Sequence, residues 1–202
     1  MYKKGILIFC TLVFLSAFIS CADWDDPFDG TGDLTLYNNT SLSINAFYLT
    51  PVSAPTWGPN RLGAPIASGA SYALTGIAAG TYDAKAAIIG TLSTYYAYAY
   101  DIPIYAWETT DLVAYNSDFS GSLKIVNDTV TASITGIYIS PTGSGSWGPN
   151  QITSSIAPDE FIHFYDLPAD SYDVRIAWDS GPDSFYYSSI VSSLTLLTLY
   201  VN

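Results

Sequence analysis

The stretch GDLTLYNNT at residues 32–40 decides the fold, because it returns at residues 121–129 as GSLKIVNDT. Three further segments recur in the same order and at nearly the same offset. They are YLTP at 48–51 and YISP at 138–141, WGPN at 57–60 and 147–150, and GTYD at 80–83 and DSYD at 170–173. Such order and spacing are typical of a tandem duplication. A unit of about 85 residues is large enough for its own core, so we predict two domains, at residues 33–116 and 121–202.

Within each copy the apolar residues alternate with polar ones. Leu34 and Leu36 in the first copy correspond to Leu123 and Ile125 in the second. This period of two predicts half-buried strands, and Gly, Pro or Asn clusters interrupt the pattern at short intervals. We therefore predict an all-β protein of two tandem antiparallel β-sandwich domains, immunoglobulin-like or transthyretin-like. Strands are expected near 33–37, 43–50, 70–75, 81–89, 93–102, 110–115, 122–126, 131–140, 160–165, 171–178, 184–191 and 195–201.

The tripeptides at 38–40 and 127–129 fall between the first two strands of each copy. Asn and Asp tolerate the left-handed conformation that tight turns require. Both tripeptides also spell an Asn-x-Thr glycosylation sequon,. We favour the turn.

Residues 1–20 have the features of a secretory signal. Lys3 and Lys4 precede an apolar run that ends at Ser20, and this run is too short to span a membrane. The residues Phe18-Ile19-Ser20-Cys21 resemble the lipobox of bacterial lipoproteins. This resemblance implies cleavage before Cys21, lipidation of its thiol with groups such as palmitate, and attachment to a membrane.

The cysteine count agrees with this interpretation. Cys10 lies inside the predicted signal, so Cys21 would be the one cysteine of the mature chain and could form no internal disulfide. The alternative is a secreted soluble protein cleaved after Ala22, since Ser20-Cys21-Ala22 also fits a small-x-small cleavage site.

The mature chain would be strongly acidic. It keeps four of the six basic residues against all 18 acids, a formal charge of −14, which disfavours nucleic acid as a partner. Residues 21–32 are rich in Asp and are expected to form an acidic tether. Acidic stretches after a lipidated cysteine resemble surface-export signals of some bacterial lipoproteins, which implies the outer membrane or cell surface rather than the inner membrane.

The repeated Trp-Gly-Pro-Asn allows two interpretations. Gly and Pro fix a turn, so Trp57 and Trp147 are held near a domain end, where Asn60 or Asn150 can cap the turn. In a structural role each indole plugs the open end of its sandwich. In a functional role it faces solvent and stacks on a sugar ring or anchors a partner.

Tyr82 and Tyr172 each follow a turn and open a strand. They resemble the corner tyrosine of immunoglobulin-like sandwiches, which implies a hydroxyl that hydrogen-bonds back to the chain.

An aromatic run at residues 95–107 has no sequence counterpart in the second copy. In a strand, Tyr96, Tyr98 and Tyr100 share one face, with Ala97 and Ala99 on the other. This ladder, with Trp107 nearby, could bind carbohydrate or a protein. Its alternative role is aromatic packing, across strands or in the core.

No catalytic motif accompanies these features. His163 is the one histidine, no Gly-x-Ser-x-Gly elbow is present, and a zinc site would need more ligands. We expect no enzyme, no cofactor and no metal site. The body resembles uncharacterised tandem-repeat β-sandwich lipoproteins of bacteria, without a named family.

The predicted function is that of a lipid-anchored cell-envelope protein whose two modules serve binding or structural interaction. Its expected partners are the membrane through Cys21 and a glycan or an envelope protein. Two alternatives stay open. One is a carbohydrate-binding or adhesin lipoprotein that uses Trp57, Trp147, Trp107 and the tyrosines of the ladder. The other is an accessory protein of a secreted hydrolase.

Overall fold

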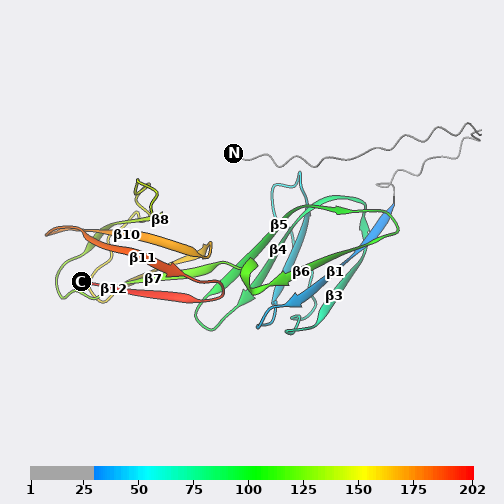
Figure 1. Cartoon of the computed structure of the whole chain (residues 1–202), viewed down its shortest axis with the longest axis horizontal. Coiled ribbons are helices and arrows are strands. Elements are labelled where there is room, and N and C mark those ends of the chain that lie inside the picture. The colour runs from blue at the N-terminus through cyan, green and yellow to red at the C-terminus, as the bar shows by residue number, and fades with distance from the viewer. Residues whose placement is uncertain (1–29) are drawn as a thin grey trace, which may run out of the picture.

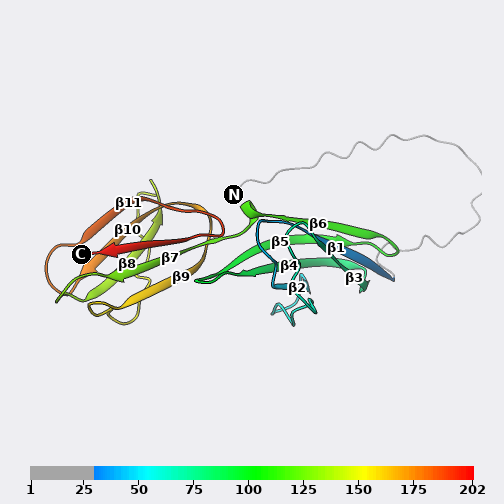
Figure 2. The ribbon, with the colours of Figure 1, turned by 90° about the horizontal axis from the view of Figure 1, so that it is seen from below.

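The computed structural model describes residues 30–202, so the predicted signal, Cys21 and most of the tether lie outside the described residues. It is an all-β protein of two sandwich domains that follow one another along its long axis (Figures 1 and 2). Domain 1 comprises β1 (Thr31–Asn39), β2 (Ala46–Pro51), β3 (Ser71–Ala78), β4 (Gly80–Ile89), β5 (Thr94–Ile104) and β6 (Thr109–Tyr115). Domain 2 comprises β7 (Gly121–Asn127), β8 (Ile134–Pro141), β9 (Phe161–Leu167), β10 (Asp170–Trp178), β11 (Ser184–Val191) and β12 (Leu196–Val201). The predicted fold class is confirmed, and a 3-10 turn, η1 (Asn116–Asp118), joins the domains.

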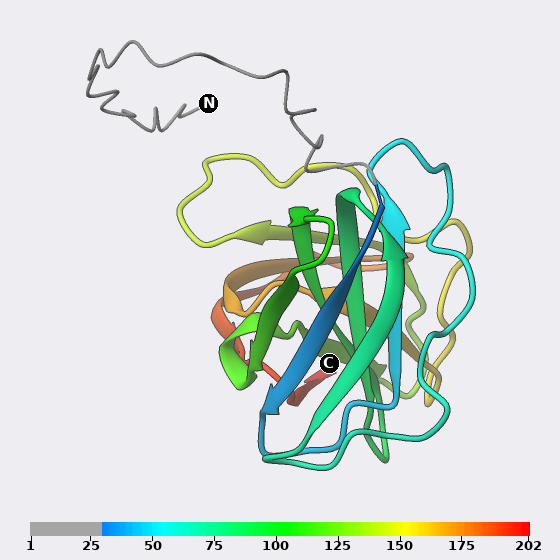
Figure 3. The same cartoon turned by 90° about the vertical axis from the view of Figure 1, so that its right-hand side faces the viewer.

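Each domain packs two three-stranded sheets face to face, as Figure 3 shows for domain 1. In domain 1 the sheets have the orders β3-β1-β6 and β2-β4-β5, and domain 2 repeats them as β9-β7-β12 and β8-β10-β11. The predicted alternation places Leu34 and Leu36 in the core of domain 1, and Leu123 and Ile125 in that of domain 2.

One strand pair in each domain runs parallel, whereas the sequence predicted antiparallel sheets throughout. The first and last strands of each domain, β1 with β6 and β7 with β12, are these pairs. Four of the five connections in a domain reverse the chain direction. The fifth, residues 52–70 in domain 1, carries the chain back along the sandwich, so β2 and β3 run the same way and β6 ends parallel to β1.

The tripeptides at 38–40 and 127–129 overlap the ends of β1 and β7 instead of lying between strands, and the side chains of Asn38 and Asn127 shape the bend that follows each strand, which differs from the prediction. Neither Asn38 nor Asn127 has a positive φ; both side chains are buried. The Asn38 Oδ1 accepts the Thr40 amide at 3.0 Å, and its Nδ2 donates to the carbonyl oxygens of Leu42 and Ile66. Asn127 repeats the arrangement in domain 2. With both amide hydrogens engaged in the interior, neither asparagine presents a nitrogen that could carry a glycan.

The corner tyrosines behave as predicted. The Tyr82 hydroxyl donates to the Ala78 carbonyl at 2.8 Å, and the Tyr172 hydroxyl donates to the Pro168 carbonyl at 2.9 Å. Burial raises the pKa of Tyr172,. Each hydroxyl thus ties the start of the central strand of one sheet to the strand or turn before it.

Candidate functional site: two aromatic platforms

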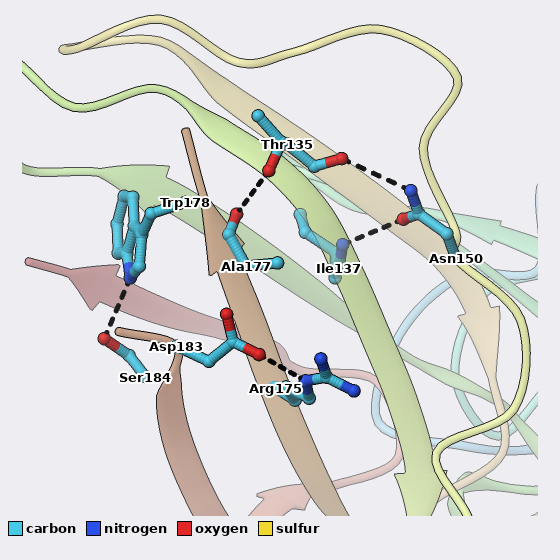
Figure 4. Close-up of polar contacts among 8 residues, drawn as sticks. All are labelled: Thr135, Ile137, Asn150, Arg175, Ala177, Trp178, Asp183 and Ser184. Atoms are coloured by element: carbon cyan, nitrogen blue, oxygen red, sulfur yellow. Dashed lines mark hydrogen bonds and ion pairs between the residues drawn. The ribbon is translucent and has the colours of Figure 1, made fainter. Parts of the chain in front are cut away.

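The Trp-Gly-Pro-Asn loop is fastened to the strand that precedes it. The Asn150 Oδ1 accepts the backbone N–H of Ile137 at 2.9 Å, and its Nδ2 donates to the Thr135 carbonyl (Figure 4). In domain 1 the Asn60 Oδ1 accepts the Phe47 N–H at 2.9 Å. The loop therefore holds a fixed position beside the sheet, which orients the tryptophan three residues earlier.

Both tryptophans lie on the outer face of a sheet. Trp57 is half-buried and contacts Tyr98 of β5, with ring centroids 5.7 Å apart. Neither Trp57 nor Trp147 belongs to a core cluster. The interpretation of a plug in the open end of the sandwich is therefore wrong, because the loop folds over the sheet surface instead of its end.

The tyrosine ladder of β5 also faces outward. Ala97 points into the core, and the neighbouring Tyr96, Tyr98 and Tyr100 lie on the opposite face. Tyr98 and Tyr100 are stacked with centroids 6.3 Å apart, and Tyr100 is 63% exposed. The Lys85 Nζ lies 4.0 Å from the centre of the Tyr96 ring, which is a cation–π distance.

Domain 2 has an equivalent arrangement that the sequence analysis missed. Trp147 lies 5.7 Å from Phe185 and 6.4 Å from Tyr187, measured between ring centroids. Phe185 and Tyr187 of β11 are stacked 6.1 Å apart and are 47% and 66% exposed. The signal that the sequence analysis missed is the pair Phe185 and Tyr187, two residues apart in β11. This pair follows Trp147 along the chain as Tyr98 and Tyr100 of β5 follow Trp57.

We call Trp57, Tyr98 and Tyr100 platform 1, and Trp147, Phe185 and Tyr187 platform 2. The two strand rings of each platform are nearly parallel, and the terminal tyrosine is the more exposed ring of each pair. A tryptophan beside an exposed tyrosine suits a ligand with a flat apolar surface and polar edges.

A bulge ends each platform. Asp101 and Ser188 have φ values of +56° and +53°, and their backbone N–H groups donate to the carboxylates of Asp83 and Asp173. The hydrogen bond from the Ser188 amide holds the pKa of Asp173 below its ordinary value,. Beyond the domain 1 bulge the side-chain alternation shifts, and Ile102 points into the core. The aspartate after each corner tyrosine therefore fixes the length of the aromatic face.

Trp107 lies elsewhere. It occupies the turn between β5 and β6 with a φ of +65°, it is 83% exposed, and its ring lies against Gly30. It therefore belongs to the end of domain 1 where β1 begins, and the structure does not bring it onto platform 1.

The two domains meet beside platform 1. The Tyr98 hydroxyl donates to Asp166 of β9 at 2.6 Å, and the Ser120 Oγ accepts the Tyr96 N–H at 2.9 Å. Burial, reinforced by the hydrogen bond to Asp166, raises the pKa of Tyr98,. Tyr96 and Tyr165 line one groove between the domains, so aromatic surface continues from domain 1 onto β9.

His163 lies within that continuation. Its ring is between Phe161 and Tyr165, at centroid distances of 5.6 and 5.2 Å, and its Nδ1 is 2.9 Å from the Tyr165 hydroxyl. Burial, together with the charge of Lys124, lowers the pKa of His163,. These contacts indicate that His163 packs between aromatic side chains of β9.

Within residues 30–202 no three His, Cys, Asp or Glu side chains are grouped so that they could hold a metal ion. In the same part of the chain, none of the helical segments has the length and apolar character needed to cross a membrane.

Comparisons with known proteins place the chain in no family. No family model matches it, and no curated protein matches its sequence. Among solved structures, the Bacillus anthracis TIE protein aligns with 13% identity and a TM-score of 0.30 over 86% of this chain and 34% of the other. GBS52, the minor pilin of the gram-positive pathogen Streptococcus agalactiae, aligns with 9% identity and a TM-score of 0.29 over 85% of this chain and 94% of the other. The chain thus spans about a third of the length of the first protein. Structural similarity as weak as in these two alignments does not indicate a function.

Proposed function

We propose that this is a non-enzymatic, lipid-anchored protein of the bacterial cell envelope that binds carbohydrate through its two aromatic platforms. The observation that carries the proposal is the duplicated platform, a loop-fixed tryptophan beside two outward-facing rings on equivalent strands. The anchor rests on the lipobox-like sequence at Cys21.

Binding explains these rings better than folding does. They lie on the outer faces of the sheets, and the core clusters form without them. Leaving Tyr100, Phe185 and Tyr187 substantially exposed forgoes the stabilisation that burial would give. Exposed aromatics gathered in one place are typical of interaction sites.

Carbohydrate is the ligand class that fits. The apolar face of a sugar ring stacks on indole and phenol rings. Its hydroxyls can hydrogen-bond to the tyrosine hydroxyls and to the carboxylates of Asp83 and Asp173, which lie at the platform ends. The chain's negative charge favours neutral or cationic glycans over anionic polymers,.

A glycan array probed with residues 22–202, which retain every described strand, tests the proposal. We expect Tyr100→Ala and Tyr187→Ala each to weaken binding to any captured glycan about fivefold, since each removes a stacking contact worth about 1 kcal/mol. The double variant should lose measurable binding, because two weak sites act together on a polymer.

Tyr200→Ala is the matched control, because Tyr200 is also 63% exposed but lies on β12, outside both platforms. Equal binding by the wild type and the double variant would refute the platforms as the site. Absence of binding to any neutral glycan would leave an envelope protein as the partner in place of carbohydrate.

A further inference from the structure

Domain 1 contains a pocket of about 320 Å³ between its two sheets. It opens at the seam between β5 and β6, each an edge strand of its own sheet. One wall consists of the methyl groups of Ala84, Ala86, Ala97 and Ala99, and Leu36 and Leu112 form part of the other.

Domain 2 fills the same space with larger side chains. The strand registers define the equivalence: Ala84 pairs with Leu49 and Ala99, and Val174 pairs with Ile139 and Tyr186. By the same registers Ile176 replaces Ala86, and Val201 replaces Ala114. Both frameworks are alike, so the pocket of domain 1 results from its small side chains.

At one equivalent position the larger side chain belongs to domain 1. Phe47 of domain 1 is larger than its counterpart Ile137 and occupies part of the space, yet the pocket persists beside it. An apolar cavity destabilises the domain that contains it, because the lining atoms lose packing partners. The pocket opens to solvent at the seam between β5 and β6, but its alanine and leucine walls offer water no hydrogen-bond partner,. An apolar occupant would restore these contacts.

The mouth of the pocket determines which ligand fits. Asp118 lies among the lining residues, with one carboxylate oxygen accepting the Tyr115 N–H at 2.8 Å. Residues 30–202 carry 14 acids and four basic residues, and this excess of negative charge repels an anionic head group.

We infer that the pocket binds the alkyl chain of a cationic amphiphile, with the chain between the sheets and the cation beside Asp118. This site shares Tyr98 with platform 1, but its interior is separate from the face contacts of the platforms, because the alanines point inward and Trp57 and Tyr100 lie on the outer face of the same sheet.

The alanine methyl groups provide a direct readout. Residues 22–202 with ¹³C-labelled alanine methyls are titrated with decyltrimethylammonium below its micelle concentration. We expect saturable chemical-shift changes at Ala84, Ala86, Ala97 and Ala99, and a rise in unfolding temperature on the order of 10 °C at a hundredfold excess over the Kd. Decanoate, with the same chain and the opposite charge, should bind at least tenfold more weakly.

A variant that carries the residues of domain 2, A84V/A86I/A99Y, fills the pocket. We expect it to lose at least tenfold in affinity, followed at the remaining Ala97 methyl. The single variant A86I, which adds less volume, should show an intermediate loss and keeps the test valid if the triple variant does not fold. Alanine methyls that do not shift, or an unchanged affinity in the filled variants, would overturn the inference and leave the platform proposal unaffected.

Discussion

At the scale of single residues, buried polar side chains shape each domain. Asn38 and Asn127 each satisfy backbone groups of a turn and of a distant loop from inside the protein. Buried polar groups are tolerated where every hydrogen-bonding atom has a partner. These residues therefore hold the long β2–β3 and β8–β9 loops to the first strand of their domains.

Asn38→Ala should destabilise domain 1 by about 3 kcal/mol, because it removes the buried hydrogen bonds of the side chain to the carbonyls of Leu42 and Ile66 and to Thr40,. Urea unfolding followed by tryptophan fluorescence measures the change. Asn39→Ala is the control, since Asn39 is the exposed neighbour, and it should change the stability by less than about 0.5 kcal/mol. A similar loss in both variants would contradict the role given to the buried amide.

Asp173 gives domain 2 an acid-dependent contribution to stability. Its pKa lies below the ordinary value of 3.8 in the folded state, because its carboxylate accepts the Ser188 N–H. A depressed folded pKa means that the stabilisation is complete above the unfolded pKa and is lost as the pH falls through the folded one. We expect Asp173→Asn to be less stable than the wild type at pH 7 and to approach it as the pH falls through the folded pKa of Asp173,. Thermal unfolding across this range measures the difference, and a gap that stays constant with pH would contradict the prediction.

At the scale of the strands and their connections, the two copies keep the same backbone with different residues. Gly69 and Asp159 precede β3 and β9 with φ values of +76° and +64°, and their N–H groups donate to the carbonyls of Asn38 and Asn127. Both turns need the left-handed region, which glycine adopts freely and Asp at a modest cost.

Gly69→Ala should therefore destabilise domain 1 by about 1 kcal/mol. A Cβ at this position would touch nothing within 4 Å, so the cost comes from the backbone alone. Gly63→Ala is the matched control: its Cβ would be equally free of contacts, but its φ is not positive, and its stability should not fall. Chemical denaturation of the two variants checks the prediction, and equal stabilities would show that the turn at Gly69 adapts.

At the scale of the whole molecule, the two domains lie end to end. β1 begins at the end of domain 1 that is farther from domain 2 (Figures 1 and 2). If Cys21 is lipidated, as we propose, domain 1 is the membrane-proximal module and domain 2 the distal one. Two platforms on one rod-like body would then be presented at different distances from the membrane.

The proposed anchor predicts the behaviour of Cys21→Ser in a bacterial host. The wild-type protein should fractionate with membranes and show the mass of a diacylated or triacylated Cys21 at its N-terminus. The variant should lack that mass and leave the membrane fraction on detergent-free extraction, because no lipid chain holds it. A wild-type N-terminus at Asp23 without lipid would refute the anchor and support the secreted alternative.

Much of this architecture follows from the sequence. The period of two and the turn residues predicted all twelve strands close to their observed bounds, because alternation directly reports which side chains face a core,. The Tyr-Asp dipeptides predicted the corner hydrogen bonds. Alternation does not report which strands are neighbours or in which direction they pair, so the parallel first and last strands were not predicted.

The sequence by itself determined the duplication, the all-β class and which side chains of a strand share a face. Only the tertiary structure decided where those faces point. It placed Trp57 over Tyr98 and Trp147 over Phe185, moved Trp107 to the other end of the domain, and showed that four alanines line a pocket. The reason is physical: a platform or a pocket is made by residues from separate strands and loops, and their proximity depends on strand order and loop path, which local patterns do not encode.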